Sequence, residues 1–240
     1  MQKNILNKNL ELFDDIEKKF KVEKELLLAL WGIETNFGKY VGKMDIISSL
    51  ATLSFDQRRS EFFSRELIIL LKLIDKQLIQ IDTLYGSWAG ALGNFQFMPS
   101  TIEAYAIDYD ENNKVELKDS IYDSIASAAN YINKIGWNYK SICFHEVKLT
   151  QKIPIKYINT SAKKIKNYQK IKSWKNKGVV GLDNLKIGDD SKAALIMPDG
   201  NENSPTYLVF DNYQKILKWN RSLRFGITVC TLANMIKNEI

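Results

Sequence analysis

Residues 31–38 read Trp-Gly-Ile-Glu-Thr-Asn-Phe-Gly and place one carboxylate, Glu34, among aromatic and glycine residues. Apolar residues recur at helical spacing just before it, which predicts a helix from Val22 to Thr35. Aromatic neighbours remove water from a carboxyl group, and desolvation disfavours its charged form. Glu34 is therefore a candidate general acid that protonates a leaving oxygen. The alternative, on this segment alone, is an ordinary exposed helical glutamate.

A second segment, residues 86–99, reads Gly-Ser-Trp-Ala-Gly-Ala-Leu-Gly-Asn-Phe-Gln-Phe-Met-Pro. Its small residues let a ligand approach the backbone closely. Ser87 and Gln96 supply neutral hydrogen-bonding groups, and the aromatic residues around them supply flat apolar faces. This combination suits a sugar, which has hydroxyls at its edges and an apolar ring face. The alternative is a packing turn made of small residues.

The rest of the chain predicts a mainly α (α+β) protein, with a helical core and a small β-containing insertion. Apolar residues at helical spacing predict helices over residues 10–20, 60–80 and 222–237. Capping-box sequences predict helix starts at 100–103 and 120–123, and Gly136 predicts a helix end. Short β-leaning segments occur at residues 142–149, 153–158, 193–197 and 207–210, with a turn at 198–205.

Composition excludes several classes of protein. The chain has 240 residues, is 45% hydrophobic and carries a net charge of +6, which argues against disorder and coiled coils. Its apolar runs are too short for a transmembrane segment. The first residues lack an apolar stretch and a cleavage site, so we expect no signal peptide in the chain as given.

Histidine and cysteine are scarce. The single histidine, His145, excludes multi-histidine zinc sites and leaves little room for Ser-His-Asp chemistry. Carboxylates, amides and hydroxyls are left for catalysis. Cys143 and Cys230 are too few for a disulfide scaffold, and the sequence leaves open whether they form one bridge.

Basic charge is concentrated in one region. Between Val147 and Leu182 there are ten lysines and no acidic residue. This pattern is typical of a solvated face on a lysine-rich protein, and the alternative is attraction to an anionic polymer such as cell-wall glycan or nucleic acid. The segment has no arginine, the residue that nucleic-acid readers favour. We therefore expect no nucleic-acid partner.

Five motifs together, in this order, resemble the membrane-bound lytic murein transglycosylase B family. The order and spacing match across roughly residues 22–140, whereas residues 141–212 match only loosely. The motifs lie at residues 31–38, 49–55, 58–63, 86–100 and 219–222.

The resemblance implies a lysozyme-like fold that cuts the MurNAc-β-1,4-GlcNAc bond of peptidoglycan. We expect a single catalytic domain over residues 1–240, with the lysozyme-like helical core at 22–140 and 213–240 and a small β-containing sub-domain at 141–212. Glu34 takes the position of the one catalytic acid, which later acts as a base. The sugar's own C6 hydroxyl attacks C1 and gives a 1,6-anhydro end, so no second carboxylate is required, unlike in most glycosidases.

Six further positions match residues that the family uses to contact substrate. Arg58 and Arg59 can also be explained as surface ion-pair partners, Asn220 as a helix-start residue and Tyr131 as part of the core. We expect peptidoglycan strands as the partner, no catalytic cofactor, a periplasmic or cell-envelope location and a monomer. The six positions are Arg58, Arg59, Ser87, Gln96, Tyr131 and Asn220.

Residues 108–119 read as a twelve-residue calcium loop, a feature that the resemblance also includes. Position six is Asn113 where glycine is usual, but asparagine tolerates a left-handed backbone. The alternative is a turn rich in Asp and Asn. The predicted ligands of a structural Ca²⁺ are Asp108, Asp110, Asn112, the carbonyl of Lys114, and Asp119.

The sequence leaves two functional alternatives open. A hydrolytic muramidase on the same fold would use water in place of the C6 hydroxyl. A non-catalytic peptidoglycan-binding protein would keep the groove without turnover.

Overall fold

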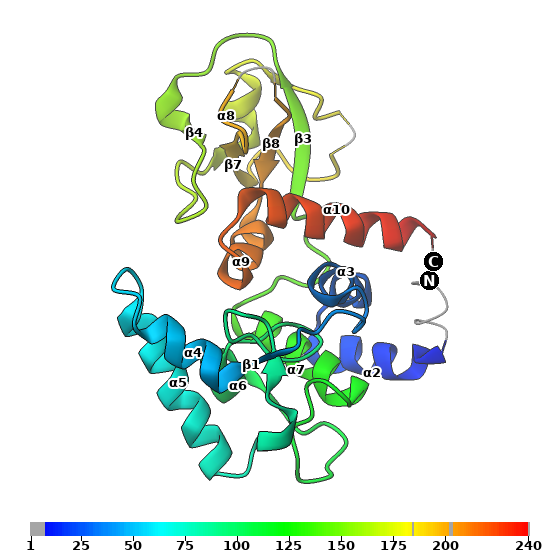
Figure 1. Cartoon of the computed structure of the whole chain (residues 1–240). Helices are drawn as coiled ribbons and strands as arrows, with labels where there is room; N and C mark the ends of the chain where they lie inside the picture. Colours follow the sequence, from blue (N-terminus) through cyan, green and yellow to red (C-terminus); the bar gives the residue numbers. More distant parts are fainter. Residues whose placement is uncertain (1–7, 184, 202–203, 240) are drawn as a thin grey trace. The chain divides into compact units, whose positions relative to one another are not determined.

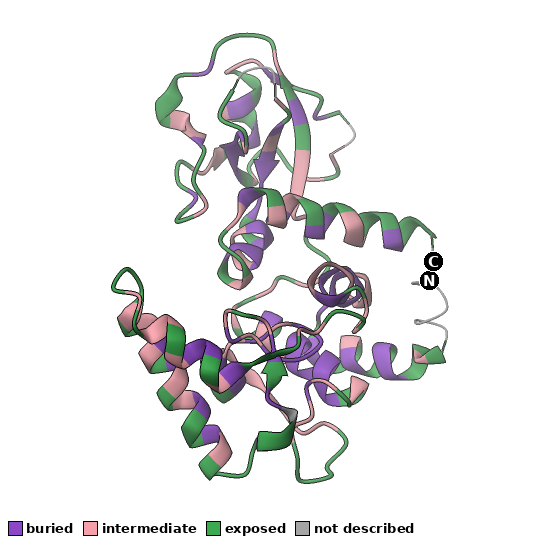
Figure 2. Cartoon of the chain, viewed as in Figure 1, coloured by how far each residue is buried: buried purple, intermediate pink, exposed green. Residues whose placement is uncertain are grey.

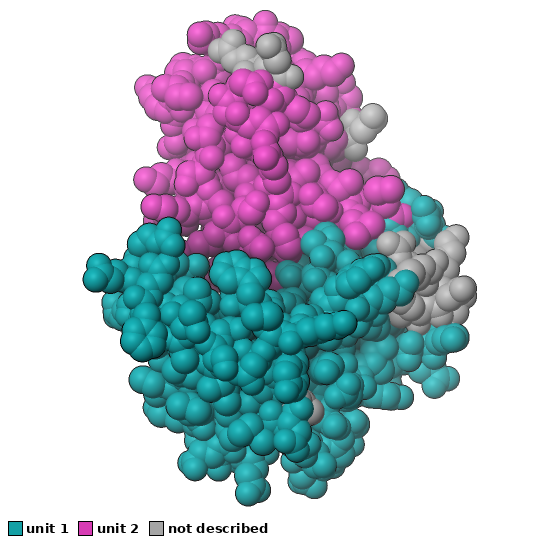
Figure 3. All heavy atoms as spheres, viewed as in Figure 1, with its two compact units in different colours: residues 1–134, 236–240 teal, residues 135–235 magenta. Residues whose placement is uncertain are grey.

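The computed structural model describes residues 8–183, 185–201 and 204–239, and these fall into two compact units (Figure 3). Unit 1 comprises residues 1–134 and 236–240, and unit 2 comprises residues 135–235. The first seven residues, on which the signal-peptide prediction rests, lie outside the described residues, as do two residues of the predicted turn at 198–205. Within the described chain, no helix is long and apolar enough to cross a membrane.

Unit 1 is built of helices, and one of them, α3 (Lys24–Thr35), is buried over most of its length. Every residue from Leu26 to Trp31 is buried, so this helix is apolar on all sides, as a helix inside a core must be (Figure 2). The other elements are α2 (Leu10–Phe20), β1 (Met44–Asp45), α4 (Ile46–Ser54), α5 (Ser60–Asp75), η1 (Ile81–Thr83), β2 (Tyr85–Gly86), α6 (Pro99–Tyr105) and α7 (Ile121–Lys134).

In unit 1 one predicted helix end is wrong, and one predicted helix start is right to within a residue but lacks the predicted cap. The helix expected over residues 60–80 ends at Asp75, and Gln77 then takes a left-handed φ of 58°. Ser100 does not cap a helix: α6 begins one residue earlier at Pro99, and the Ser100 hydroxyl donates instead to Glu66. The sequence could not show this because Glu66 lies on a different helix.

The two other boundary predictions are confirmed. The Asp123 N–H donates to the Ser120 hydroxyl oxygen at 3.3 Å, as an N-cap requires at the start of α7. Gly136 follows the end of α7 with a φ of 91°, the left-handed conformation that glycine adopts without steric cost.

Unit 2 contains a mixed sheet in the strand order β4-β7-β8-β3-β6, with β5 also paired to β7. β4 runs parallel to β7, and the remaining pairs are antiparallel. The strands are β3 (Phe144–Leu149), β4 (Ile158–Asn159), β5 (Gln169–Lys170), β6 (Val179–Val180), β7 (Lys192–Ile196) and β8 (Thr206–Val209) (Figure 1). The helices are η2 (Ile155–Tyr157), α8 (Ile171–Lys175), α9 (Asp211–Trp219) and α10 (Leu223–Glu239), whose last residues, from Ile236, belong to unit 1.

The sheet buries both of its faces, which explains the unbroken apolar run in β7. Ala193 and Leu195 belong to a core that includes Trp174 of α8. Ala194 and Ile196 belong to a separate core that includes Tyr213 of α9. Alternate residues of one strand thus pack on opposite sides of the sheet.

The β-containing insertion is confirmed, with corrections. The segments at 142–149, 193–197 and 207–210 form β3, β7 and β8. The strand expected at 153–158 is wrong over most of its length, because residues 155–157 form the turn η2. Helix α8 was not predicted. Helix α9 falls largely within residues 213–240, which were predicted as part of the helical core, and it belongs to unit 2 together with the sheet.

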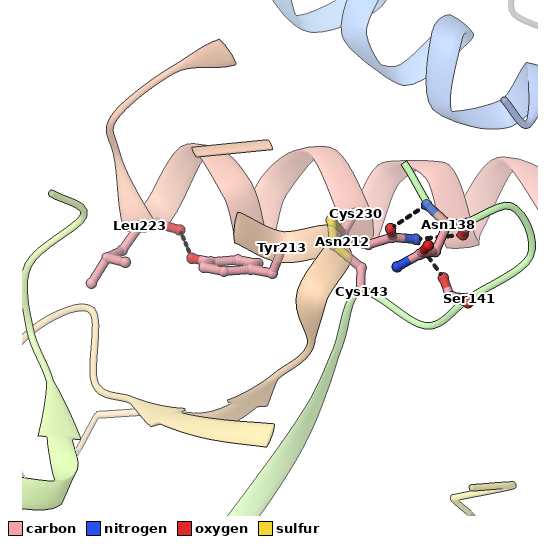
Figure 4. The surroundings of a disulfide bond; sticks show 7 residues. All are labelled: Asn138, Ser141, Cys143, Asn212, Tyr213, Leu223 and Cys230. Atoms are coloured by element: carbon pink, nitrogen blue, oxygen red, sulfur yellow. Dashed lines mark hydrogen bonds between the residues drawn. A yellow bond between two sulfur atoms is a disulfide. The ribbon is translucent and has the colours of Figure 1, made fainter. Parts of the chain in front are cut away.

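A disulfide joins Cys143, just before β3, to Cys230 in α10, with the two Cα atoms 6.3 Å apart (Figure 4). Beside it the Asn212 side chain donates to the carbonyls of Asn138 and Ser141, and accepts from the Asn138 N–H at 2.8 Å. The bond settles the question that the sequence left open.

Candidate active site

Glu34 lies half-buried one residue before the end of α3, as predicted. The chain turns sharply after it, because Asn36, Phe37 and Gly38 all have left-handed φ angles of 49°, 59° and 79°. A Cβ on Gly38 would lie 2.7 Å from the side-chain oxygen of Asn94, so glycine meets both the backbone and the space requirement there.

Asn94 fixes this helix end to the 86–99 segment. Its side-chain oxygen accepts from the Trp31 indole N–H at 3.1 Å, and its carbonyl accepts from the Thr35 hydroxyl at 2.8 Å. Its Nδ2 donates to the Lys118 carbonyl and to the Ser124 hydroxyl. One buried amide therefore joins α3, the 86–99 segment and the start of α7.

Asn94 lies within the 86–99 motif, and the sequence predicts no role for it. The signal was a polar amide between apolar and aromatic neighbours, which must find partners if it is buried. The sequence did not identify those partners, since they lie on three separate segments.

A continuous row of aromatic rings runs through the interior of unit 1 beside α3. Successive ring centroids lie between 4.5 and 6.4 Å apart, and the contacts are of both the edge-on and the stacked kind. Burial, followed by the nearby Tyr105, raises the pKa of Tyr131 to about 12, so its hydroxyl stays protonated at neutral pH. The row consists of Phe37, Trp31, Phe95, Phe97, Tyr131 and Tyr105.

Ser87 and Gln96 are both held by backbone partners within unit 1. The Ser87 hydroxyl oxygen accepts from the Ala91 N–H at 3.0 Å. Gln96 has a left-handed φ of 51°, and its Nε2 donates to the carbonyls of Val41 and Gly93 at 3.2 and 3.0 Å. Both side chains are half-buried and fixed in direction, as groups that position a ligand must be.

Glycine is required where the two backbone segments of this region meet. A Cβ on Gly42 would lie 2.0 Å from the Gly86 carbonyl oxygen, and a Cβ on Gly86 would lie 2.1 Å from the Ala91 carbonyl oxygen. The antiparallel pair of β1 and β2 brings these segments together, with Met44 opposite Gly86. The small residues of the 86–99 segment were predicted to let a ligand approach the backbone. In the structure, Gly86 instead lets two backbone segments come into contact.

Arg58 and Arg59 lie just before α5, at the corner with α4. The Arg58 guanidinium forms two hydrogen bonds to Asp56 and is largely exposed. These bonds lower the pKa of Asp56 to about 2. Arg59 instead lies over the Phe62 ring, 4.5 Å from its centroid. Arg58 thus has the surface ion pair that was its alternative explanation, and a substrate role for either arginine stays a prediction.

Asn220 lies in unit 2, at the C-terminal end of α9 rather than at a helix start. Its N–H donates to the Ile216 carbonyl, and its carbonyl accepts from the Ser222 N–H at 2.8 Å. Its side chain is exposed. The predicted contact with substrate stays a prediction.

The acidic loop brings three carboxylates together, and they are not all the predicted ones. One oxygen from each of Asp108, Asp110 and Asp123 lies within 4.8 Å of the others. Asp123 is fully buried and also accepts the N–H groups of Tyr109 and Glu116, at 2.7 and 2.9 Å. Asp119, the predicted closing ligand, is exposed and is not part of this cluster.

The loop backbone follows the predicted pattern. Asp108 accepts from the N–H groups of Asn112 and Asn113, and Asn113 has a φ of 68°, the left-handed conformation expected at position six. The Asn112 side-chain oxygen accepts from the Lys114 N–H at 2.9 Å.

The cluster suits a hard cation. Burial raises the pKa of Asp123, and the nearby charge of Asp110 raises it further, against the lowering effect of the backbone N–H groups. Grouped carboxylate oxygens are the ligands that Ca²⁺ prefers, and its charge would relieve this repulsion. The residues present therefore fit calcium.

A family profile described as Transglycosylase SLT domain matches residues 2–234. The chain belongs to this family. Membrane-bound lytic murein transglycosylase B of Escherichia coli (strain K12) is 31% identical over 220 residues, which cover 90% of this chain and 58% of that protein. The chain thus spans less than two thirds of that relative. The resemblance drawn from the five motifs is confirmed.

Solved structures of SLT-domain proteins share the fold. SltB3 from Pseudomonas aeruginosa, in complex with NAG-NAM-pentapeptide, has a TM-score of 0.87 at 30% identity, covering 98% of this chain and 62% of that one. A second SltB3 structure contains NAG-anhNAM-pentapeptide. Escherichia coli Slt35 in complex with calcium has a TM-score of 0.83 at 26% identity, covering 98% and 72%. The predicted lysozyme-like fold is confirmed.

Proposed function

We propose that this SLT-domain protein is a lytic transglycosylase that cleaves the MurNAc-β-1,4-GlcNAc bond of peptidoglycan. The observation that carries the proposal is the position of Glu34 at the end of α3, in a chain that matches the SLT family over residues 2–234. That SltB3 binds NAG-NAM-pentapeptide and its anhydro counterpart supports the substrate class and the type of product.

Glu34 acts first as an acid and then as a base. Its carboxyl proton passes to the glycosidic oxygen as the bond from that oxygen to C1 of MurNAc breaks. The C6 hydroxyl of the same sugar then bonds to C1, and its proton passes to the Glu34 carboxylate. No water is consumed and the acid is regenerated, so one carboxylate suffices. This differs from the paired carboxylates of most glycosidases.

The fold of unit 1 supports this role for Glu34. The Asn94 hydrogen bonds and the aromatic row immobilise the last turn of α3. A carboxyl group on a rigid helix end keeps its direction toward the reacting oxygen, which is worth orders of magnitude in rate. Ser87, Gln96 and Asn220 are proposed to contact the glycan near the acid, together with Tyr131. Arg58 and Arg59 are proposed to bind saccharide or peptide groups.

The deciding experiment is mass spectrometry of the products released from purified peptidoglycan. Wild type should release muropeptides lighter by one water than hydrolysed ones, and Glu34→Gln should release none because an amide cannot donate the acid proton. Glu25→Gln makes the same chemical change on the same helix and should remain active.

Other products would point to other functions. Hydrated reducing ends would indicate a muramidase. Glycan binding by wild type without any cleavage would indicate a non-catalytic binding protein.

Calcium is proposed as a structural ion held by Asp108, Asp110 and Asp123, with oxygen atoms of Asn112 and Lys114 completing the set. The calcium complex of Slt35 and the clustered carboxylates support it. The ion would tie the loop to the start of α7 and would take no part in bond cleavage.

A periplasmic or cell-envelope location follows from the proposed substrate. The Cys143–Cys230 disulfide supports it independently, because disulfides persist in oxidising compartments. We also infer that the protein acts as a monomer, which light scattering of the purified chain would test.

A further inference from the structure

Unit 2 contains a pocket of about 450 Å³, whose lining residues are different from those assigned to the site around Glu34. Its walls come from three parts of the chain: the stretch just before β3, the loop between β6 and β7 with the first residue of β7, and the start of α9. A volume in this range is typical of sites for small molecules and short peptide segments.

One part of the pocket lining is apolar. Phe210 belongs to the core on the α8 side of the sheet and is 7% exposed. Ile142, Leu185 and Ile187 are partly buried and pack against that same core. All four side chains line the pocket, so their proximity follows from the lining and from the core alike. We name these four residues the apolar patch, and a ligand that covers it must bring an apolar group.

Three lysines, Lys140, Lys186 and Lys192, line the same pocket, and all three are exposed. Among the described residues of the lining, Asp211 is the one acid. Its carboxylate is already paired, with one oxygen 3.3 Å from the Lys215 ammonium group. The lining therefore carries an excess of positive charge next to the apolar patch.

The acids that flank these lining segments in the sequence do not cancel this charge. Asp189 and Asp190 lie outside the lining and form ion pairs with lysines of β5 and α8, at 2.7–3.2 Å. Asp183 is exposed and lies outside the lining as well, so water screens it. The combination of lysines and an apolar patch is thus specific to the pocket.

Buried hydrogen bonds fix one wall of the pocket. Asn212, which is 1% exposed, donates to the carbonyls of Asn138 and Ser141 and accepts from the Asn138 N–H at 2.8 Å (Figure 4). The Asn138 side chain donates in turn to Asp211 at 2.9 Å. The stretch before β3 is therefore fixed to the start of α9. A preorganised wall loses less conformational entropy when a ligand binds.

We propose that this pocket binds the carboxylate end of a peptide whose last residue has an apolar side chain. The carboxylate pairs with the lysines, and the apolar side chain covers the apolar patch. The hydroxyls of Ser141 and Ser191, which also line the pocket, serve the last amide group of the peptide. Inorganic phosphate would pair with the lysines but would leave the apolar patch exposed to water. The proposal is independent of the activity proposed for Glu34.

The test is a titration of the purified full chain with N-acetyl-L-leucine, followed by NMR of its labelled isoleucine methyl groups. The signals of Ile142 and Ile187 should shift with a Kd on the order of 1 mM, and that of Ile125, which is buried in unit 1, should not. N-acetyl-L-leucinamide lacks the charge and should bind at least about tenfold more weakly. Acetate lacks the apolar side chain and should bind more weakly by a similar factor.

Two matched variants test the lysines. Lys186→Gln with Lys192→Gln should weaken binding of N-acetyl-L-leucine by about tenfold. Lys163→Gln with Lys164→Gln removes the same number of charges from exposed positions of unit 2 outside the lining, and should bind close to wild type. Thermal unfolding establishes that each variant is folded. Equal losses in the two double variants would overturn the proposal, because net charge alone would then explain binding.

The comparison of ligands on wild type does not depend on the folding of any variant. Binding of the leucinamide as tight as that of the acid would overturn the proposal. So would shifts of Ile142 and Ile187 with inorganic phosphate as large as those with N-acetyl-L-leucine. N-acetyl-D-leucine distinguishes the two sources of such a peptide end: tighter binding of the L form supports the proposal with a protein chain as the source, and tighter binding of the D form supports it with the peptide of peptidoglycan.

Discussion

The Trp31 indole N–H donates to the Asn94 side-chain oxygen at 3.1 Å, across 63 residues of sequence. Both residues are buried, and the same asparagine donates from its Nδ2 to the Lys118 carbonyl and the Ser124 hydroxyl. The direction of the last turn of α3, and with it that of Glu34, therefore depends on one amide in another segment.

Replacing Asn94 with alanine should lower the free energy of unfolding by about 3 kcal/mol, because buried partners are left without a hydrogen bond. Urea unfolding followed by circular dichroism measures the change. Asn176→Ala removes the same amide from an exposed position and should change stability by less than about 0.5 kcal/mol. Equal stability of Asn94→Ala and wild type would show that the Asn94 contacts are dispensable.

Removing one positioning group beside the proposed acid should weaken cleavage without abolishing it. Ser87→Ala should lower kcat/KM by about tenfold, because it deletes one fixed hydrogen-bonding group and leaves Glu34 intact. Gln96→Asn should act similarly, since asparagine tolerates the left-handed backbone but is too short to keep the bond to Val41. Initial rates on peptidoglycan fragments measure both. A rate near wild type in both variants would show that Ser87 and Gln96 do not position the substrate.

Much of the helical core could be predicted from the sequence because its signals are local. The apolar spacing that ends at Ile33 predicts α3, and Gly136 predicts the end of α7, since each depends on neighbouring residues alone. The β-leaning run at 193–197 predicts a strand for the same reason.

What could not be predicted depends on contacts between distant segments. Asn94 reads as one more polar residue in a loop until its partners on α3 and α7 are known. Helix α8 is only five residues long, and its Trp174 is buried by the sheet rather than by a helical pattern. Asp123 resembles a capping residue, and only the fold of the loop brings it to the carboxylates of Asp108 and Asp110.

Calcium should raise the melting temperature of the wild-type protein, and a chelator should reverse the increase, because binding to the folded state alone stabilises it. Asp110→Asn should reduce this calcium-dependent shift by weakening the site, and so should Asp123→Asn. Asp119→Asn is the matched control and should leave the shift unchanged. Differential scanning fluorimetry with and without calcium measures all four proteins. Loss of the shift in Asp119→Asn but not in Asp123→Asn would show that Asp119 is the closing ligand, as the sequence predicted, and that Asp123 is not a ligand.

The Cys143–Cys230 bond should contribute measurably to the stability of unit 2. It closes a loop between residues 87 positions apart, and restricting an unfolded chain of that length is worth about 2–4 kcal/mol. Reductant should therefore lower the urea midpoint of wild type, whereas the double variant Cys143→Ser, Cys230→Ser should unfold at that lower midpoint in both conditions. Thiol titration of the unfolded protein supplies the control, since two thiols should appear only after reduction. Two free thiols in the unreduced protein would contradict the bond and withdraw its support for an oxidising compartment.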